Sequence, residues 1–303
     1  MEILLNIIQF FTIYIFFINS QFQKSSIKRE RNSWNGFSTN YNENIRDKKS
    51  IIYYLINDKV YFECNGYIYK KHSDALQCCK YLNSGSRRSL FFLQLRGIIP
   101  NKIRSYINRT KIAVYDYKRL SIKNSFTRKI WYDIWKDCNY KCFSSNNFKH
   151  LKEGLLNEIN EYRKIHKANP LVASRYLNIL AHRYATRTSL LNYRFINPMQ
   201  TFNIMYEVIH RNEANHVLKY LFDEFINHYN YNNNIYCEKY SKQTQIIWKS
   251  TSRIGIGVME EQELIYIVII FLPKGNINNN YRNNISPISQ SSIHIYRSLK
   301  GHH

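Results

Sequence analysis

The first half of the chain has the short alternation of apolar and polar positions that favours strands. "VYFECNGYIYKK" places two aromatic runs on either side of Asn65-Gly66, a dipeptide typical of tight hairpins. "SDALQCCKYL" follows with apolar residues at helical spacing. Further alternating stretches lie at 90–98 and 112–117. These patterns predict a small α+β unit over about residues 50–135.

From residue 147 onward the apolar positions recur at the spacing of helices. One amphipathic helix is predicted to end before Pro170, a second runs from Arg175 to Leu190, and a third covers about residues 212–229. Two β-rich runs, "RIGIGVM" and "ELIYIVIIFL", come after them. Because the second run is almost continuously apolar, it predicts a central strand buried on both faces. Helices followed by closely spaced strands indicate an α+β layered domain of roughly 130 residues.

The two ends of the chain carry weaker patterns. Residues 1–20, "MEILLNIIQFFTIYIFFINS", are predicted to be a secretory signal peptide, and the run Ile3–Ile18 would instead anchor the chain in a membrane if it were not cleaved. Residues 21–49 are polar and charged without periodicity, which predicts a flexible linker. Residues 278–303 are rich in Asn and Ser and are predicted to form a disordered tail.

The charge of the chain is strongly positive and unevenly distributed. The net charge is +23, and 26 of the 44 Lys and Arg residues lie in the first 150 positions. Such a balance favours anionic partners, among them anionic lipid, sulfated glycan and acidic proteins. Zinc-finger spacing, an RNP-like aromatic motif and a basic heptad helix are all missing from the sequence, so specific nucleic-acid recognition is not expected.

Cysteines and glycosylation sequons agree with an oxidising compartment. An even number of cysteines in a secreted chain predicts disulfides, with the pairing left open, and five of the six lie before residue 143. The disulfide candidates are Cys64, Cys78, Cys79, Cys138, Cys142 and Cys237. Asn108 in "NRT" and Asn284 in "NIS" are candidate glycosylation sites, although Pro287 after the second one disfavours its use.

Four stretches of the second half match family signatures in the right order. "NEYRKIH" before "NPL" is one, "YE" at 206–207 a second, "TQIIWKST" at 244–251 a third and "FLPKGNI" at 271–277 the fourth. The chain over 147–277 resembles the CAP superfamily, which includes cysteine-rich secretory proteins, antigen 5 allergens, pathogenesis-related 1 proteins and the venom-allergen-like proteins of parasitic worms. The resemblance implies a three-layer α-β-α sandwich, preceded here by a basic, cysteine-containing α+β module at 50–146.

The resemblance also implies a cleft with two His and two Glu that can bind a divalent metal. In this chain Glu207 and Glu224 match the two acids, but Lys242 stands in the place of one His and the other His is missing. A charged ammonium cannot ligate a metal, and it could instead pair with Glu207 or Glu224. We therefore expect a degenerate site with no metal and no cofactor. In the family the polar half of the 244–251 stretch lines the cleft; the signature residues are Thr244, Gln245, Trp248, Pro273, Gly275 and Asn276.

The expected function is binding without catalysis, by a protein that is secreted and extracellular. The resemblance implies a lipid or sterol ligand or an extracellular host protein, and the basic first half adds a sulfated glycan as a possible partner. The alternative is a secreted hydrolase that uses the cleft carboxylates Glu207 and Glu224 as an acid–base pair. A membrane-anchored surface protein is the third hypothesis. The sequence leaves the oligomeric state open.

Overall fold

In the computed structural model, strand β8 (Leu264–Leu272) lies at the centre of a four-stranded sheet with the order β5-β7-β8-β6. β7 (Arg253–Glu261) and β6 (Asn203–His210) flank it in antiparallel pairing. The short β5 (Val172–Ala173) runs parallel to β7. All residues of β8 before Leu272 are buried, which confirms the prediction of a central strand covered on both faces.

The structure describes residues 50–84, 97, 109–116, 124–188 and 202–289. They belong to one unit, which runs from residue 46 to residue 303. The predicted signal peptide, the predicted linker, the stretch 90–96 and Asn108 lie outside the described residues. Within the described part of the chain, every helix is too short or too polar to cross a membrane.

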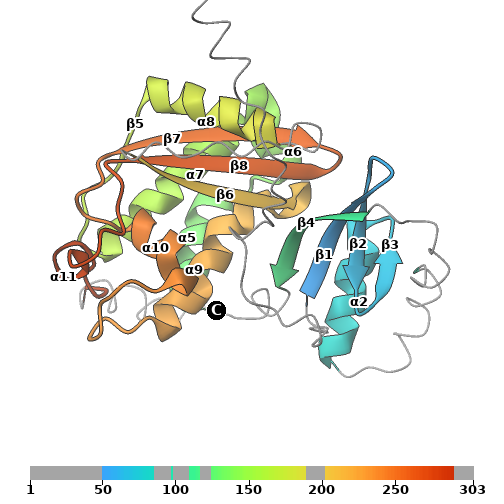
Figure 1. The fold of residues 1–303 in the computed structure, drawn as a ribbon, viewed down its shortest axis with the longest axis horizontal. Coiled ribbons are helices and arrows are strands. Elements are labelled where there is room, and N and C mark those ends of the chain that lie inside the picture. Colours follow the sequence, from blue (N-terminus) through green and yellow to red (C-terminus); the bar gives the residue numbers. More distant parts are fainter. Residues whose placement is uncertain (1–49, 85–96, 98–108, 117–123, 189–201, 290–303) are drawn as a thin grey trace, which may run out of the picture. The chain divides into compact units, whose positions relative to one another are not determined.

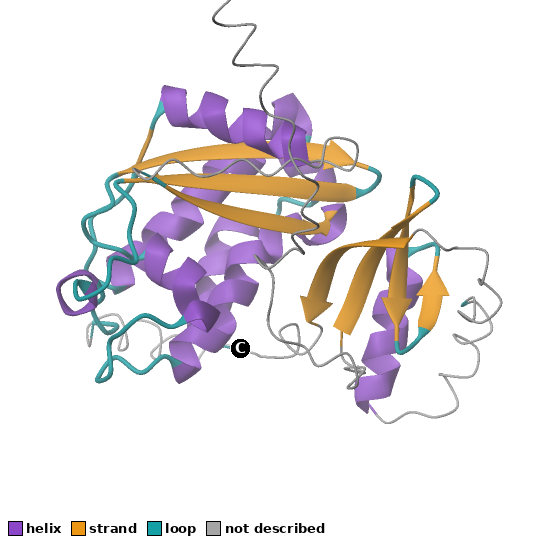
Figure 2. Ribbon diagram, viewed as in Figure 1, coloured by secondary structure: helices purple, strands orange, loops and turns teal. Residues whose placement is uncertain are grey.

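Helix α8 (Arg175–Thr188) forms one outer layer of the sandwich, on one face of the sheet (Figures 1 and 2). Two glycines of β7 allow the backbone of α8 to lie very close to the sheet. A Cβ added to Gly257 would lie 2.1 Å from the carbonyl carbon of Ala181, and one added to Gly255 would lie 2.2 Å from that of Leu177. The side chains of α8 that face the sheet pack on Val268 and Ile270 of β8.

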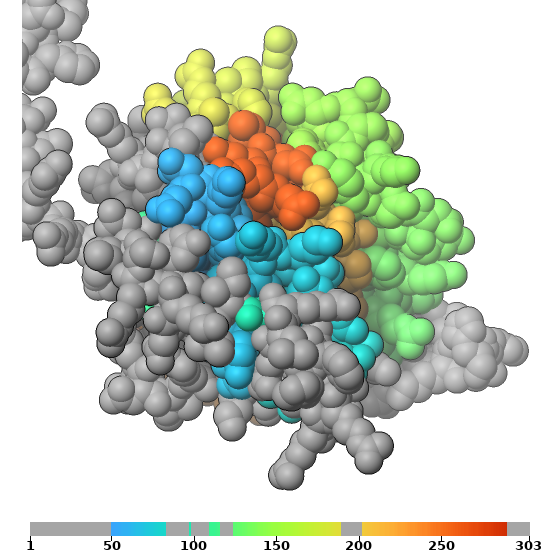
Figure 3. Space-filling model, turned by 90° about the vertical axis from the view of Figure 1, so that its right-hand side faces the viewer, coloured from blue at the N-terminus to red at the C-terminus, as the bar shows by residue number. Residues whose placement is uncertain are grey.

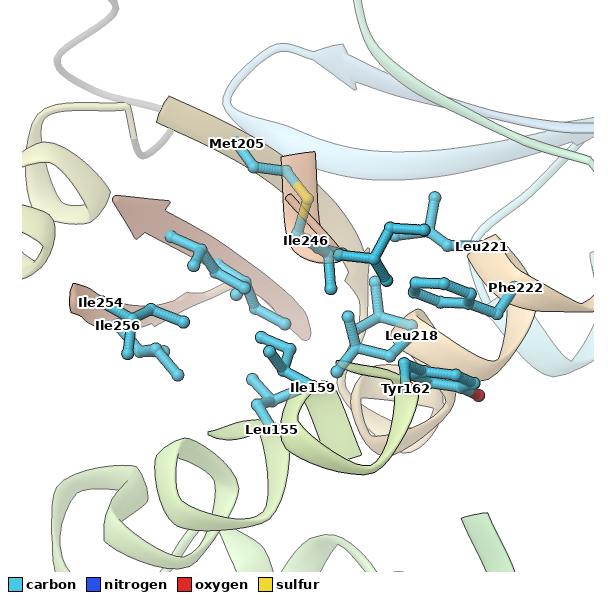
Figure 4. Close-up of a cluster of buried hydrophobic side chains, with 14 of the residues drawn as sticks. Leu155, Ile159, Tyr162, Met205, Leu218, Leu221, Phe222, Ile246, Ile254 and Ile256 are labelled. Carbon is cyan, nitrogen blue, oxygen red and sulfur yellow. The ribbon is translucent and has the colours of Figure 1, made fainter. Parts of the chain in front are cut away.

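The opposite face of the sheet carries the other helical layer and the main apolar core. This layer contains α5 (Ser125–Trp135), α6 (Tyr140–Phe143), α7 (Ser145–Ile165), η2 (Arg211–His216), α9 (Val217–His228), η3 (Glu238–Tyr240) and α10 (Ser241–Ile246). Figure 4 shows Leu155 and Ile159 of α7 and Leu218 and Phe222 of α9 in this core, with Ile256 of β7. The arrangement is the expected three-layer α-β-α sandwich, which we call the larger domain (residues 124–289).

The described part of the N-terminal module (residues 50–84 and 109–116) is a second four-stranded sheet with one helix. Its strands are β1 (Ser50–Ile56), β2 (Lys59–Cys64), β3 (Tyr67–Tyr69) and β4 (Arg109–Asp116), in the order β3-β2-β1-β4, and its helix is α2 (His72–Ser84). β2 and β3 form the predicted hairpin, with Asn65 and Gly66 both at positive φ, as a tight two-residue hairpin turn requires.

The module packs against one end of the larger domain's sheet. Leu264 and Tyr266 of β8 lie in the same apolar cluster as Tyr53 and Phe62 of the module. Figure 3 shows the blue and cyan residues of the module beside the orange residues of β7 and β8. The contact buries aromatic side chains of both parts, so the module extends the apolar core of the larger domain.

Two segments differ from the expected organisation. Residues 124–143 precede the predicted domain start at 147, yet Ile130 and Trp135 of α5 lie in the main core. The tail predicted to be disordered from 278 is ordered as far as 289: it forms α11 (Tyr281–Asn284), and Tyr281 and Ile285 are buried. Tyr281 packs edge-to-face on Trp248, with the ring centroids 5.0 Å apart, which explains why this Asn-rich segment is held.

Candidate functional site

Lys242 and Glu207 form an ion pair at the predicted cleft. β6 carries Glu207 and α10 carries Lys242, and the two meet with Nζ 2.6 Å from Oε1. The same ammonium donates to the carbonyl oxygen of Tyr206 at 3.2 Å. The side chains are only partly exposed, 30% for Lys242 and 15% for Glu207, so water screens the pair less than it would at an open surface. A lysine side chain therefore lies against the carboxylate that a metal would need.

Glu224 has a different lysine. It lies on α9, and its carboxylate pairs with Lys239 of η3. The hydrogen bond to Glu224 raises the pKa of Lys239, so the lysine remains charged at neutral pH. Of the two acids that the family pattern supplies, each is thus paired with its own ammonium group.

The residues present do not fit a metal ion. Among the described residues, no group of three or more His, Cys, Asp or Glu is placed to hold one. His210, three positions after Glu207, accepts a hydrogen bond from the Asn212 amide at its Nδ1 (3.3 Å) and has its Nε2 3.8 Å from Glu263. His182 is exposed on α8, in the layer on the other side of the sheet.

The polar part of the first signature is buried, which corrects the expectation that it lines the cleft. Gln243, Thr244 and Gln245 lie on α10 and are at most 4% exposed. Gln243 donates to the carbonyl of Leu221 at 2.9 Å, so it ties α10 to α9. These side chains serve the packing of the domain, since buried amides and hydroxyls need such partners.

The two signature stretches hold each other together. Thr244 donates to the side chain of Asn276 at 2.8 Å, and the Gln245 Oε1 accepts from the amide of Gly275 at 2.7 Å. A Cβ on Gly275 would lie 2.6 Å from Cγ of Trp248, so only glycine fits under the indole. Pro273 precedes this contact, and its carbonyl accepts a hydrogen bond from Thr251 at 2.9 Å.

Arg163 is a central residue of this region that the sequence analysis missed. Its side chain is fully buried on α7 and donates to four backbone carbonyls. The acceptors and distances are Asn169 (2.6 Å), Ile246 (2.7 Å), Trp248 (2.9 Å) and Thr251 (2.8 Å). The arginine of "NEYRKIH" thus fixes the turn after α10. A basic residue on the predicted apolar side of a helix was the available signal.

A second pair of polar residues lies where the module meets the larger domain. His72 at the start of α2 stacks on His210 at the end of β6, with the ring centroids 4.2 Å apart and the planes 7° from parallel. Tyr53 Oη lies 3.1 Å from His72 Nε2. Burial lowers the pKa of His72 to about 3, helped by His210, and it lowers the pKa of His210 to about 4. Both imidazoles are therefore neutral at physiological pH.

Four of the six candidate cysteines form disulfides. Cys64–Cys79 joins the hairpin to α2, and Cys138–Cys142 closes the turn between α5 and α6. Both bridges lie in the first half of the chain, as expected. The expectation fails for the other two candidates, because Cys78 and Cys237 are free thiols and Cys78 is buried.

Of the two sequons, only Asn284 is described. Its Nδ2 donates to the Asn280 carbonyl at 2.9 Å, and its Oδ1 accepts from the Ser250 amide at 3.0 Å. The side chain therefore helps to hold α11 in place.

Comparison with known proteins finds a family match in the second half of the chain. Residues 156–271 match the family model described as CAP, the cysteine-rich secretory protein family. Among solved structures, BmVAL-1 is 17% identical with a TM-score of 0.35, over 42% of this chain and 79% of that one. Venom allergen-like protein 4 of Schistosoma mansoni is 15% identical with a TM-score of 0.34, over 56% and 99%. NaASP2, solved with Zn²⁺, is 10% identical with a TM-score of 0.31, over 56% and 88%.

No curated protein sequence matches the chain. Structural likeness at these identities and TM-scores says nothing about a shared ligand, since one fold supports many functions. The family model, by contrast, spans α7 to β8, the part of the chain that contains Glu207, Glu224 and the 244–251 signature. Residues 156–271, which are less than half of the chain, therefore match the model of the CAP, or cysteine-rich secretory protein, family.

Proposed function

We propose that this protein is secreted and acts by binding, without catalysis, through a CAP domain whose metal site is degenerate. The observation that carries the proposal is the ion pair of Lys242 with Glu207, at 2.6 Å. An ammonium group in this place repels a divalent cation and occupies the carboxylate that would coordinate it. The residues that the structure describes supply no ligand set for metal-dependent chemistry at this position.

Secretion has support from two independent features. The apolar run of residues 1–20 has the character of a signal peptide. The disulfides Cys64–Cys79 and Cys138–Cys142 need an oxidising compartment to form and persist.

The proposed ligand is a lipid or sterol, or an extracellular protein, and the family resemblance is the basis for this choice. A sulfated glycan is a further candidate because of the net charge of +23.

Native mass spectrometry on the full chain, made in a eukaryotic secretory host, tests both parts of the proposal. Zinc and a total lipid extract are offered separately. We expect a lipid-sized mass gain and no stoichiometric zinc. Stoichiometric zinc would contradict the degenerate site. The absence of any lipid adduct would contradict the lipid ligand and leave a protein or a glycan as the partner. Pull-down on immobilised heparin then tests the glycan.

The alternative of a hydrolase makes a separate prediction. It requires Glu207 and Glu224 as acid and base, so the double variant Glu207→Gln/Glu224→Gln would lose any hydrolysis of protein or ester substrates. The matched control is Glu153→Gln/Glu161→Gln, which removes two acids of α7 from outside the cleft. Hydrolysis by the wild type and the control, but not by the cleft variant, would refute a purely binding role.

A further inference from the structure

Helix α8 exposes a ridge of basic and apolar side chains. Arg175, Ile179, Arg183 and Arg187 are spaced four apart, so they lie along one side of the helix, and Tyr176 lies beside them. All five are exposed. The opposite side of α8 is buried on the sheet (Figure 1), so this ridge faces outward from the sandwich.

The apolar members of the ridge are unusually open. Val172 is 60% exposed, Tyr176 66% and Ile179 48%, and they are three of the seven large apolar residues that are exposed among the described residues. Exposed apolar side chains are common when they are scattered. Here they gather at the start of α8 and in the β5 strand just before it, between arginines.

The chain segment that contains the ridge has charge of one sign only. From Tyr162 to Tyr206 the sequence contains no Asp or Glu. Within the described part of the chain, the guanidinium groups of Arg175, Arg183 and Arg187 have no carboxylate partner. Arg253 of β7 is a further exposed cation. It lies near the ridge, because it is the register partner of Val172 in the sheet. Arginines without counter-charges favour an anionic partner.

We propose that the α8 surface, made of Val172, Arg175, Tyr176, Ile179, Arg183 and Arg187, docks on the surface of an anionic lipid membrane. Tyr176, Ile179 and Val172 would enter the boundary between headgroups and acyl chains, while the arginines bind lipid phosphates. Arginine suits this role because its alkyl stem lies along apolar surface and its guanidinium reaches outward.

The shape of this surface favours a membrane over a peptide or a glycan chain. The outer side of a helix that lies on a sheet is convex, and proteins usually bind extended peptides in grooves or at sheet edges. A planar lipid surface contacts the whole ridge at once. The proposal does not rest on the proposed function, since it requires neither secretion nor a ligand near Glu207.

Vesicle co-sedimentation of the full chain tests the proposal. The probes are vesicles of phosphatidylcholine alone and vesicles that contain phosphatidylserine as well. The test variants are Arg175→Gln/Arg183→Gln/Arg187→Gln, which removes charge, and Tyr176→Ser/Ile179→Ser, which removes apolar surface. The matched control, Arg128→Gln/Lys149→Gln/Lys164→Gln, removes three exposed charges from α5 and α7 in the opposite layer.

We expect binding to the phosphatidylserine vesicles that falls roughly 100-fold in the arginine variant, because each basic residue near an anionic surface contributes a factor of roughly five. The Tyr176/Ile179 variant also weakens, and the control binds like the wild type. Any contribution from the N-terminal apolar run is equal in all variants and insensitive to lipid charge. Three outcomes would overturn the proposal: equal loss in the control, no dependence on lipid charge, or an apolar variant that binds normally. The last would indicate a purely ionic polyanion site.

Discussion

Protonation of the buried histidine pair should make the protein sensitive to mild acid. His72 and His210 are 4% and 6% exposed, and they stack directly on each other. Phe62 packs edge-on against both rings, and Tyr53 binds His72. The nearest charged groups, Glu263 and Arg211, lie on the His210 side and act in opposite directions on its pKa. A proton on either ring would be placed in an apolar contact that has little to stabilise it.

The sign and size of the effect follow from the pKa values. A histidine that titrates near 6.5 when unfolded and at about 3 or 4 when folded is neutral in the fold. Its contribution to stability is complete above about pH 6.5 and is lost as the pH falls toward the folded value. At about pH 5.5 each such histidine lowers the free energy of unfolding by about 1.4 kcal/mol, so the pair costs about 3 kcal/mol.

The variant His72→Phe separates this effect from the rest of the protein. Phenylalanine keeps an aromatic ring between Phe62 and His210 but cannot be protonated. Urea unfolding, followed by tryptophan fluorescence at about pH 7.5 and about pH 5.5, gives the loss of stability for each protein. We expect the wild type to lose about 1.4 kcal/mol more than the variant over this interval.

The matched control is His150→Phe, at an exposed position of α7 where the imidazole meets water in both the folded and the unfolded chain. It should lose as much stability as the wild type. If His72→Phe has the same acid dependence as the wild type, His72 is accessible to protons in the folded state, and the buried stack does not exist in solution.

Three substitutions in the core make further predictions. Burial raises the pKa of Glu158 to about 8, so the stability it contributes is complete below about pH 4.5 and is lost as the pH rises toward 8. Glu158→Gln keeps an acceptor for the Trp135 indole and should raise the free energy of unfolding by about 2 kcal/mol at about pH 7.5. A lower free energy of unfolding in the variant would show that the fold needs the carboxyl group of Glu158. In Arg163→Lys the ammonium group cannot reach the four carbonyls that the guanidinium binds, and urea unfolding should show that the free energy of unfolding falls by about 3 kcal/mol. A fall of less than about 1 kcal/mol would contradict the role given to the Arg163 guanidinium. Gly257→Ala forces α8 away from the sheet at Ala181, and calorimetry should show that the free energy of unfolding falls by about 1–3 kcal/mol. An unchanged Tm would mean that α8 lies farther from the sheet than the structure shows.

Local patterns were sufficient to predict the elements that depend on local physics. β8 was predictable because a strand covered on both faces is apolar throughout, and the β2–β3 hairpin because Asn65-Gly66 accepts positive φ. β6 was not predicted as a strand: its alternation is weak, and its partner β8 is far along the chain. The helix at Tyr281 was hidden in an Asn-rich segment, because a long-range contact with Trp248 holds it.

In the candidate site, too, local patterns predicted some contacts, whereas contacts between distant segments were not predicted. A lysine in place of a metal-binding histidine predicts an ion pair with one of the acids, and in the structure Lys242 forms this ion pair with Glu207. The partner of Glu224 is Lys239, which no motif pointed to. The burial of Gln243 and Gln245 depends on a carbonyl and an amide supplied by distant segments, so the cleft position that the family resemblance implied for this polar stretch was wrong. The stacking of His72 on His210 joins two parts of the chain that share no sequence signal.

The packing of the module on β8 has a practical consequence for protein production. A fragment cut at the family boundaries, 156–271, would lose Ile130 and Trp135 from the core and would open Leu264 and Tyr266 to solvent. Its central strand would then present an apolar end of the kind that drives aggregation. Soluble expression therefore calls for a fragment that begins before Ser50 and extends past Ile285, with both disulfides allowed to form.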